Sequence, residues 1–324
     1  MITSEIISFL GKDWERFEDM MKSGLSTDVN LLRSINEGIL ASSGKHLRPI
    51  ICMLVARALG KPNEDSLRYA AACELLHNAT LMHDDVADES PKRRGNPSVS
   101  ALLGPSSAVL IGDFWLSRAV DLVMSANTRD RVAKFFSKTL TDLAEGEMLQ
   151  LEKASSADTD EHAYYRIIHN KTASLFEAAG KAAAVSVEAT DQCFEAAGVF
   201  ADCFGMAFQI KDDILDYAGD SKLGKPVGMD IRERKITLPL LGAMLEAGEE
   251  RGAAIREKIK AVREHPEYCG EIHSFVISNG GVEYAASRLE EHIKAACEAL
   301  EPFPDSPAKQ YLVDIAHFNA FRQV

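Results

Sequence analysis

The sequence predicts an all-α fold, and three features of its composition support this. Only 7% of the residues are aromatic, just 11 are proline, and the helix-favouring residues Ala, Leu and Glu are abundant. Apolar residues make up 46% of the 324 positions, which is ample for a large core. No loop segment is long enough to link two domains, so we expect one domain over residues 1–324.

Short polar segments divide the chain into helices. They lie at residues 60–65, 89–98, 103–107, 153–162, 219–228 and 301–307. The first precedes a helix from about Asp65 to Asp88, whose apolar residues recur mostly every fourth position and form one stripe. Asp158 with Glu161 resembles a capping box that opens a later helix. The last segment separates a short helix at the C-terminus.

Charge, cysteines and hydropathy exclude several classes of protein. The formal net charge of −13 argues against a nucleic-acid partner, because phosphate backbones select basic surfaces. The six cysteines form no C-x-x-C pair and have no histidines at zinc spacing, so we interpret them as reduced core residues of a cytoplasmic protein. The N-terminus does not resemble a signal peptide, and no segment reaches the roughly 18 apolar residues of a spanning helix. We therefore expect no transmembrane segment.

An acidic motif, Asp-Asp-x-x-Asp, occurs twice. It reads "HDDVAD" at 83–88 and "KDDILD" at 211–216, each time after an apolar helical segment. At roughly 100° per residue, His77, Asp84 and Asp88 share one stripe of the first helix. Aspartates at i and i+4 repel each other, and at a helix C-terminus they also oppose the macrodipole. One such motif is typical of a solvated helix end, whereas two indicate a bound cation.

Basic residues follow both motifs. Lys92, Arg93 and Arg94 come after the first, and Lys222 and Lys225 after the second. Magnesium is usually held by one or two carboxylates together with substrate phosphates, and lysine and arginine bind the remaining phosphate charge. The sequence therefore predicts two magnesium diphosphate sites, which would hold one cluster between them if they face each other.

Six runs of sequence carry a family resemblance. They are "SGKHLRP" (43–49), "ELLHNATLMHDDVADESPKRRGNPS" (74–98), "VLIGDFWLSRA" (109–119), "EGEMLQLE" (145–152), "NKTASLFEAAG" (170–180) and "FGMAFQIKDDILDYAGDSKLGKPVGMDIRERKITLPLL" (204–241). In this order they resemble the trans-type isoprenyl diphosphate synthases, and more narrowly the long-chain polyprenyl synthases. The resemblance implies an all-α isoprenoid synthase fold, with about ten core helices around a central active-site cavity, that works as a homodimer.

The resemblance also implies the site residues. A cluster of Mg²⁺ ions, about three per site in the family, would be held by Asp84, Asp88, Asp212 and Asp216. The positions that match the allylic diphosphate site are Arg93, Lys171, Thr172, Gln209, Lys225 and Lys235. The positions that match the isopentenyl diphosphate site are Gly44, Lys45, Arg48, His77 and Arg94. The family often has glycine and arginine where this chain has Ser43 and His46, but neither departure removes a matched ligand.

These assignments imply a prenyltransferase. Metal and cationic side chains would stabilise the departing diphosphate, and the double bond of isopentenyl diphosphate would attack the allylic cation. Thr172 and Gln209 would present oxygens to that cation; the alternative for Thr172 is a hydroxyl bonded to its own helix backbone. The expected partners are the two diphosphate substrates and a second copy of the chain, with room for transient membrane contact when product is released.

Other functions explain fewer of these residues. A metal phosphohydrolase that uses His83 and Asp84 needs further histidine ligands, and class I terpene cyclases usually lack the basic residues that Lys45 and Arg48 supply. A non-catalytic subunit should have lost aspartates. A short-chain synthase that makes farnesyl or geranylgeranyl diphosphate is the main alternative, and the sequence does not specify the primer or the pathway.

Product length should depend on the helix before Asp84. In the family, short products go with bulky aromatic residues four and five positions before the first aspartate, where this chain has Thr80 and Ala79, with Leu76 a turn deeper. One helical turn rises about 5.4 Å, close to one isoprene unit, so we predict a product of about six to ten units. The alternative is that Ala79 simply packs against a neighbouring helix.

Overall fold

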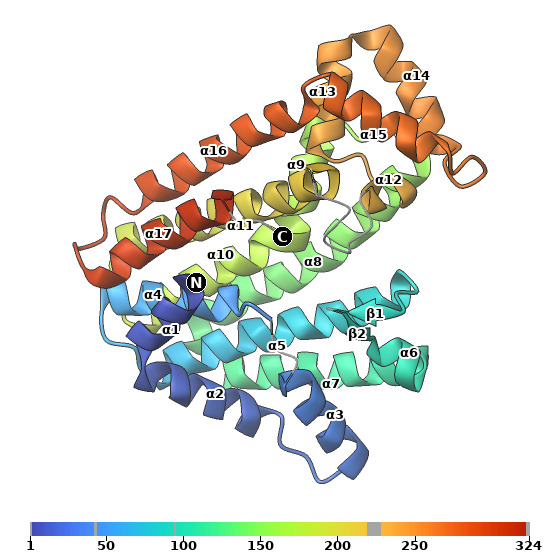
Figure 1. The fold of residues 1–324 in the computed structure, drawn as a ribbon. Helices are drawn as coiled ribbons and strands as arrows, with labels where there is room; N and C mark the ends of the chain where they lie inside the picture. Colours follow the sequence, from blue (N-terminus) through green and yellow to red (C-terminus); the bar gives the residue numbers. More distant parts are fainter. Residues whose placement is uncertain (1, 42–43, 94, 219–227, 322–324) are drawn as a thin grey trace. The chain divides into compact units, whose positions relative to one another are not determined.

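Figure 1 shows the computed structural model, which describes residues 2–41, 44–93, 95–218 and 228–321. Nearly all of this part of the chain is helical, which confirms the all-α prediction. It contains two compact units, one of residues 1–136, 178–198 and 302–312 and one of residues 137–177, 199–301 and 313–324. The expectation of one domain stays a prediction.

The elements have the following bounds. In chain order they are α1 (Ile2–Leu10), α2 (Lys12–Gly24), α3 (Asn30–Ala41), α4 (Leu47–Leu59), α5 (Glu64–Ala87), β1 (Lys92–Arg93), β2 (Asn96–Pro97), α6 (Val99–Leu103), α7 (Pro105–Met124), α8 (Arg129–Ser156), α9 (Glu161–Ile168), the π-helix η1 (His169–Ala173), α10 (Ser174–Ser186), α11 (Asp191–Ala218), α12 (Met229–Arg232), α13 (Leu238–Ala247), α14 (Glu249–Lys260), α15 (Tyr268–Ser278), α16 (Gly281–Ala299) and α17 (Pro307–Phe321).

Helix α5 is the centre of the first unit, where it packs against α2, α4 and α7. It was expected from about Asp65 to Asp88 and runs from Glu64 to Ala87. Helix α4 is buried on all sides from Arg48 to Ala56, as its continuous apolar sequence requires.

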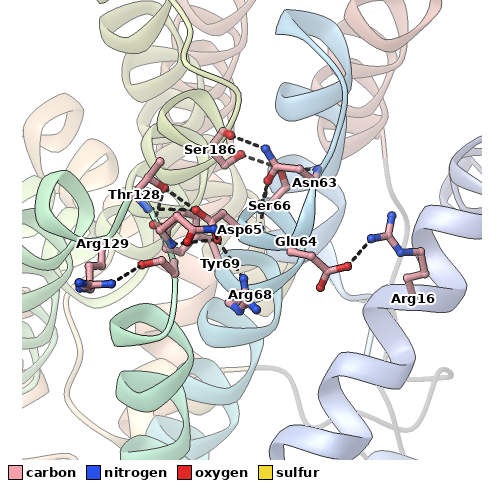
Figure 2. Close-up of polar contacts among 12 residues, drawn as sticks. Arg16, Asn63, Glu64, Asp65, Ser66, Arg68, Tyr69, Thr128, Arg129 and Ser186 are labelled. Atoms are coloured by element: carbon pink, nitrogen blue, oxygen red, sulfur yellow. Dashed lines mark hydrogen bonds and ion pairs between the residues drawn. The ribbon is translucent and has the colours of Figure 1, made fainter.

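Two side chains fix the start of α5 (Figure 2). Asn63 forms a capping box, in which its side chain accepts from the backbone N–H groups of Asp65 and Ser66. The buried carboxylate of Asp65 accepts from the backbone N–H of Thr128 at 3.0 Å and from that of Asn127 at 3.1 Å. These bonds hold the helix that carries the first acidic motif.

The segment after α5 is a hairpin rather than the expected plain loop. Strands β1 and β2 pair antiparallel, with Arg93 opposite Asn96. The turn between them requires Gly95 at a φ of 82°, a conformation that glycine adopts without steric strain. The hairpin places Arg93 next to the end of α5.

In the second unit, close helix contacts surround the π-helix η1. A Cβ added at Gly205 of α11 would lie 2.6 Å from the Cα of Ala173, and one added at Gly146 of α8 would lie 2.9 Å from the backbone nitrogen of Lys171. Only glycine permits these approaches. The π-helix between them carries Lys171 and Thr172.

One expectation needs correction. Helix α9 is capped by Asp160, whose side chain accepts from the backbone N–H of Ala163 at 2.7 Å, whereas Asp158 bonds with Ser156 and Lys153. The capping-box assignment was therefore two residues early.

The segment Asp191–Tyr217 of α11 is long and apolar enough, by length and composition, to cross a membrane, although half of its most apolar window is buried inside the protein. The polar residues of the second motif stand at its end.

Candidate active site

The first acidic motif ends α5. Asp88 is the C-cap residue, and its backbone N–H donates to the carbonyl of Asp84 at 2.8 Å. The side chain of Asp84 is half-buried and that of Asp88 is exposed. Both lie where the helix dipole is negative, so the position itself disfavours two anions and favours a bound cation.

The middle aspartate of this motif has a different environment. Asp85 is 3% exposed. It accepts from Arg93 Nε at 2.9 Å and from Arg93 Nη2 at 2.5 Å. Arg93, which the family resemblance places at the allylic diphosphate, therefore joins the hairpin to α5 here. This pairing leaves Asp84 and Asp88 as the accessible carboxylates of the motif.

The second motif, on α11, repeats the pattern. Asp213 is 4% exposed and accepts from Tyr164 Oη at 2.6 Å and from Gln209 Nε2 at 2.9 Å. Burial and the charge of Asp230 raise the pKa of Asp213 well above its usual value. Asp212 is half-buried. In both motifs, the middle aspartate is thus part of the protein's internal hydrogen bonding.

Asp216 has a structural role that the sequence did not indicate. Its two carboxylate oxygens accept from the backbone N–H groups of Met229 and Asp230, each at 3.1 Å. Burial raises the pKa of Asp216. Burial together with the charge of Asp216 also raises the pKa of Asp230 to about 7. Asp230 belongs to the "GMDIRERK" run, but its approach to Asp216 depends on tertiary structure.

Four of the predicted allylic-site residues line one pocket of about 140 Å³ in the second unit. They are Lys171, Thr172, Gln209 and Lys235, together with the acidic residues Asp213 and Asp230. The hydroxyl of Thr172 donates to Gln209 Oε1 at 2.8 Å, so the alternative of a bond to its own helix backbone is not what the structure shows. Lys171 Nζ lies 2.7 Å from a carboxylate oxygen of Glu147, and Lys235 pairs with Glu233. The pocket thus joins two cations to a Thr172–Gln209–Asp213 hydrogen-bond chain.

The predicted isopentenyl-site residues lie around the start of α4 and on α5. Lys45 is exposed, Gly44 and His77 are half-buried, and Arg48 is buried. Sequence reasoning missed Glu74, which is 2% exposed and lies within electrostatic reach of Arg48 and His77. The i, i+3 spacing of Glu74 and His77 on one helix was the available signal. Arg94 and Lys225, predicted for the two diphosphate sites, lie outside the described residues.

The three predicted chain-length residues differ in exposure. Leu76 and Ala79 are each 1% exposed. Thr80 is half-buried, and its hydroxyl donates to the carbonyl of His77 at 2.8 Å. A large side chain at position 79 would therefore have to displace packed neighbours.

Several known proteins are similar to this chain in sequence and in fold. A model of the polyprenyl synthetase family matches residues 29–275. The all-trans-nonaprenyl-diphosphate synthase (geranyl-diphosphate specific) of Rhodobacter capsulatus is 38% identical over 313 residues, covering 96% of this chain and 95% of the relative. The octaprenyl diphosphate synthase of Haemophilus influenzae is 36% identical over 323 residues, covering 99% and 98%. A crystal structure of a polyprenyl synthase from Caulobacter crescentus, complexed with calcium and isoprenyl diphosphate, matches with a TM-score of 0.91 at 33% identity, over 99% of this chain and 98% of that one.

The helical fold and these relatives show that the chain is a transferase of the prenyl diphosphate synthase class, with the isoprenoid synthase fold. The chain belongs to the polyprenyl synthetase family.

Proposed function

We propose that this protein is a magnesium-dependent trans-prenyltransferase that condenses isopentenyl diphosphate with an allylic diphosphate to make a long-chain polyprenyl diphosphate. The observation that carries the proposal is the difference in environment between the middle and the outer aspartates of the motifs. Asp85 and Asp213 are buried and paired within the protein, whereas Asp84 and Asp88 keep access to solvent at a helix end. Relatives that match over nearly the whole chain are named for long-chain products.

The donor set fits a hard divalent cation. Asp84 and Asp88 in the first unit, and Asp212 in the second, offer carboxylate oxygens, which Mg²⁺ prefers. When bound, Mg²⁺ would neutralise charge on the diphosphate group, and we propose the family's complement of about three ions. Asp216 can bind a metal through its remaining lone pairs while it holds residues 229 and 230.

In the proposed reaction, side chains of the protein bind the two substrates and stabilise the charges that develop. Lys171 and Lys235 bind the allylic diphosphate and stabilise the charge that grows on it as the C–O bond breaks. The Thr172–Gln209 pair directs oxygens toward the allylic carbon, where positive charge develops. Lys45, Arg48 and His77 hold isopentenyl diphosphate, whose double bond forms the new C–C bond to the allylic carbon; a proton then passes from the condensation product to the released diphosphate. No side chain acts as a nucleophile.

We further propose a homodimer in the cytoplasm. The outward face of α7 exposes four large apolar side chains, Val109, Leu110, Val120 and Met124, with exposures of 38% to 68%. A row of this kind on one helix is typical of a surface that a protein partner covers. Analytical ultracentrifugation of the protein and of Leu110→Glu tests this assembly, because the variant should sediment as a monomer.

One experiment tests the function. The protein is incubated with Mg²⁺, labelled isopentenyl diphosphate and an allylic primer, and the products are separated by thin-layer chromatography. We expect label in a product of about six to ten isoprene units, because positions 79 and 80 carry small side chains along the proposed path of the chain. Label confined to three or four units would favour a short-chain synthase, and no incorporation would contradict the proposal.

A further inference from the structure

Glu74 is a buried carboxylate that none of the steps above uses. It lies on α5, is 2% exposed, and its Oε1 is 2.9 Å from His46 Nδ1. Asn78, one turn later, donates to the backbone carbonyl of Glu74 at 2.8 Å. A charged side chain is rarely this buried unless it is paired.

The surroundings of Glu74 are cationic. Burial alone would raise the pKa of its carboxyl group, but the hydrogen bond from His46 and the charges of His77, His46 and Arg48 outweigh burial and lower the pKa to about 2. Glu74 is therefore an anion at any physiological pH. Arg48 and His77 are two of the residues that match the isopentenyl diphosphate site.

His46 connects Glu74 to the loop that leads into α4. It is the N-cap residue of α4 and has a φ of 48°, which a non-glycine residue adopts only when its surroundings hold it there. Its ring packs edge-on against Trp14 and Phe17, with centroids 6.0 and 6.4 Å apart. Because Lys45 and Arg48 stand on either side of His46, the bond to Glu74 also fixes where their backbone lies.

We propose that Glu74 is a positioning residue for isopentenyl diphosphate: by anchoring His46 it holds the backbone that carries Lys45 and Arg48 in place for the diphosphate group, without touching that group. The inference rests on the proposed function. A preformed set of cations binds a diphosphate without first having to be ordered, so the effect of Glu74 should appear in the affinity for this one substrate.

Replacement of a buried carboxylate that has only a structural role should leave the affinity for isopentenyl diphosphate unchanged. The same helix contains such a carboxylate, which serves as the control. Asp65 is 4% exposed and also accepts several hydrogen bonds, but its partners are Asn127, Thr128 and Arg68 at the start of α5 (Figure 2). Asp65→Asn and Glu74→Gln thus remove one buried charge each from the same helix. Only the second is connected to the isopentenyl-site cations.

Steady-state kinetics with each substrate varied in turn test the proposal. Glu74→Gln should raise the KM for isopentenyl diphosphate about tenfold, as expected when a supporting partner of a binding residue is lost, and should leave kcat and the allylic KM within about twofold. Glu74→Asp, which keeps the charge, should recover much of the loss. Asp65→Asn should lower the melting temperature and leave both KM values unchanged.

His46→Phe tests the same link if Glu74→Gln does not fold. Its ring can occupy the place beside Trp14 and Phe17 but cannot donate to Glu74, so it too should raise the isopentenyl KM selectively. An unchanged isopentenyl KM in the folded variants, or equal rises in both KM values, would overturn the positioning role. Neither result would affect the proposed function, provided that the wild type still transfers prenyl groups. A wild type that incorporates no isopentenyl diphosphate would overturn the proposed function and this inference together.

Discussion

Asp84 and Asp85 are neighbours in the chain, and the structure predicts opposite consequences when each is changed to asparagine. Asp85→Asn removes the charge that pairs with Arg93. Breaking a buried pair by removal of one partner costs about 3–5 kcal/mol, but the Arg93 side chain is 37% exposed, and solvent reduces this to about 1–3 kcal/mol. For 324 residues, an unfolding entropy of about 2.1 cal/mol/K per residue converts this to a melting temperature about 2–4 °C lower.

Asp84→Asn relieves repulsion with Asp88 instead, so stability should stay within about 0.5 kcal/mol of the wild type. Its turnover should fall at least about a hundredfold, because a metal ligand is lost. Calorimetry and the labelled-isopentenyl assay on both variants check the contrast. The reasoning is refuted if Asp84→Asn melts as low as Asp85→Asn, or if Asp84→Asn keeps near-wild-type turnover.

Three more predictions concern the substrate sites and pH. Lys45→Ala and Arg48→Ala should chiefly raise the KM for isopentenyl diphosphate, whereas Lys225→Ala should chiefly raise the KM for the allylic substrate. If all three variants changed only the KM for the allylic substrate, the assignment of the two sites would be wrong. Ala79→Phe should shorten the product to about three or four units without abolishing the first condensation, read by chromatography, and an unchanged product would exclude position 79 from the path. The pKa of Glu74 is about 2 in the folded protein, below its ordinary value of 4.5, so the ionised carboxylate contributes roughly 3 kcal/mol to the free energy of unfolding. This contribution is present above about pH 4.5 and is lost as the pH falls toward 2. Urea unfolding at pH 7 and pH 3 should show this loss in the wild type and much less of it in Glu74→Gln.

The sequence was most informative where periodicity determines structure. The repeat of apolar residues located α5 to within one residue at each end, because a helix of this length must bury one stripe. The same periodicity predicts that Asp84 and Asp88 share one face. Capping was less predictable, since Asp158 and Asp160 both suit an N-cap and only the geometry of the chain selects Asp160.

The roles of the middle aspartates depend on residues distant in sequence or in a hairpin. Asp213 is bonded by Tyr164, which lies 49 residues earlier. Asp85 is bonded by Arg93 because the chain turns between the end of α5 at Ala87 and strand β1, which brings Arg93 back to the helix end. Sequence spacing alone makes all three aspartates of a motif look equivalent. The π-helix at residues 169–173 likewise depends on close packing around it and has no local sequence signal.

The central claim is that the outer aspartates bind a metal diphosphate, and calorimetric titration with an allylic thiolodiphosphate, which does not react, tests it most directly. Wild-type protein should bind this analogue only when Mg²⁺ is present, and Asp84→Asn and Asp212→Asn should each weaken that binding by at least about tenfold while remaining folded. Equal binding in the presence of EDTA, or undiminished binding by both variants, would contradict the account.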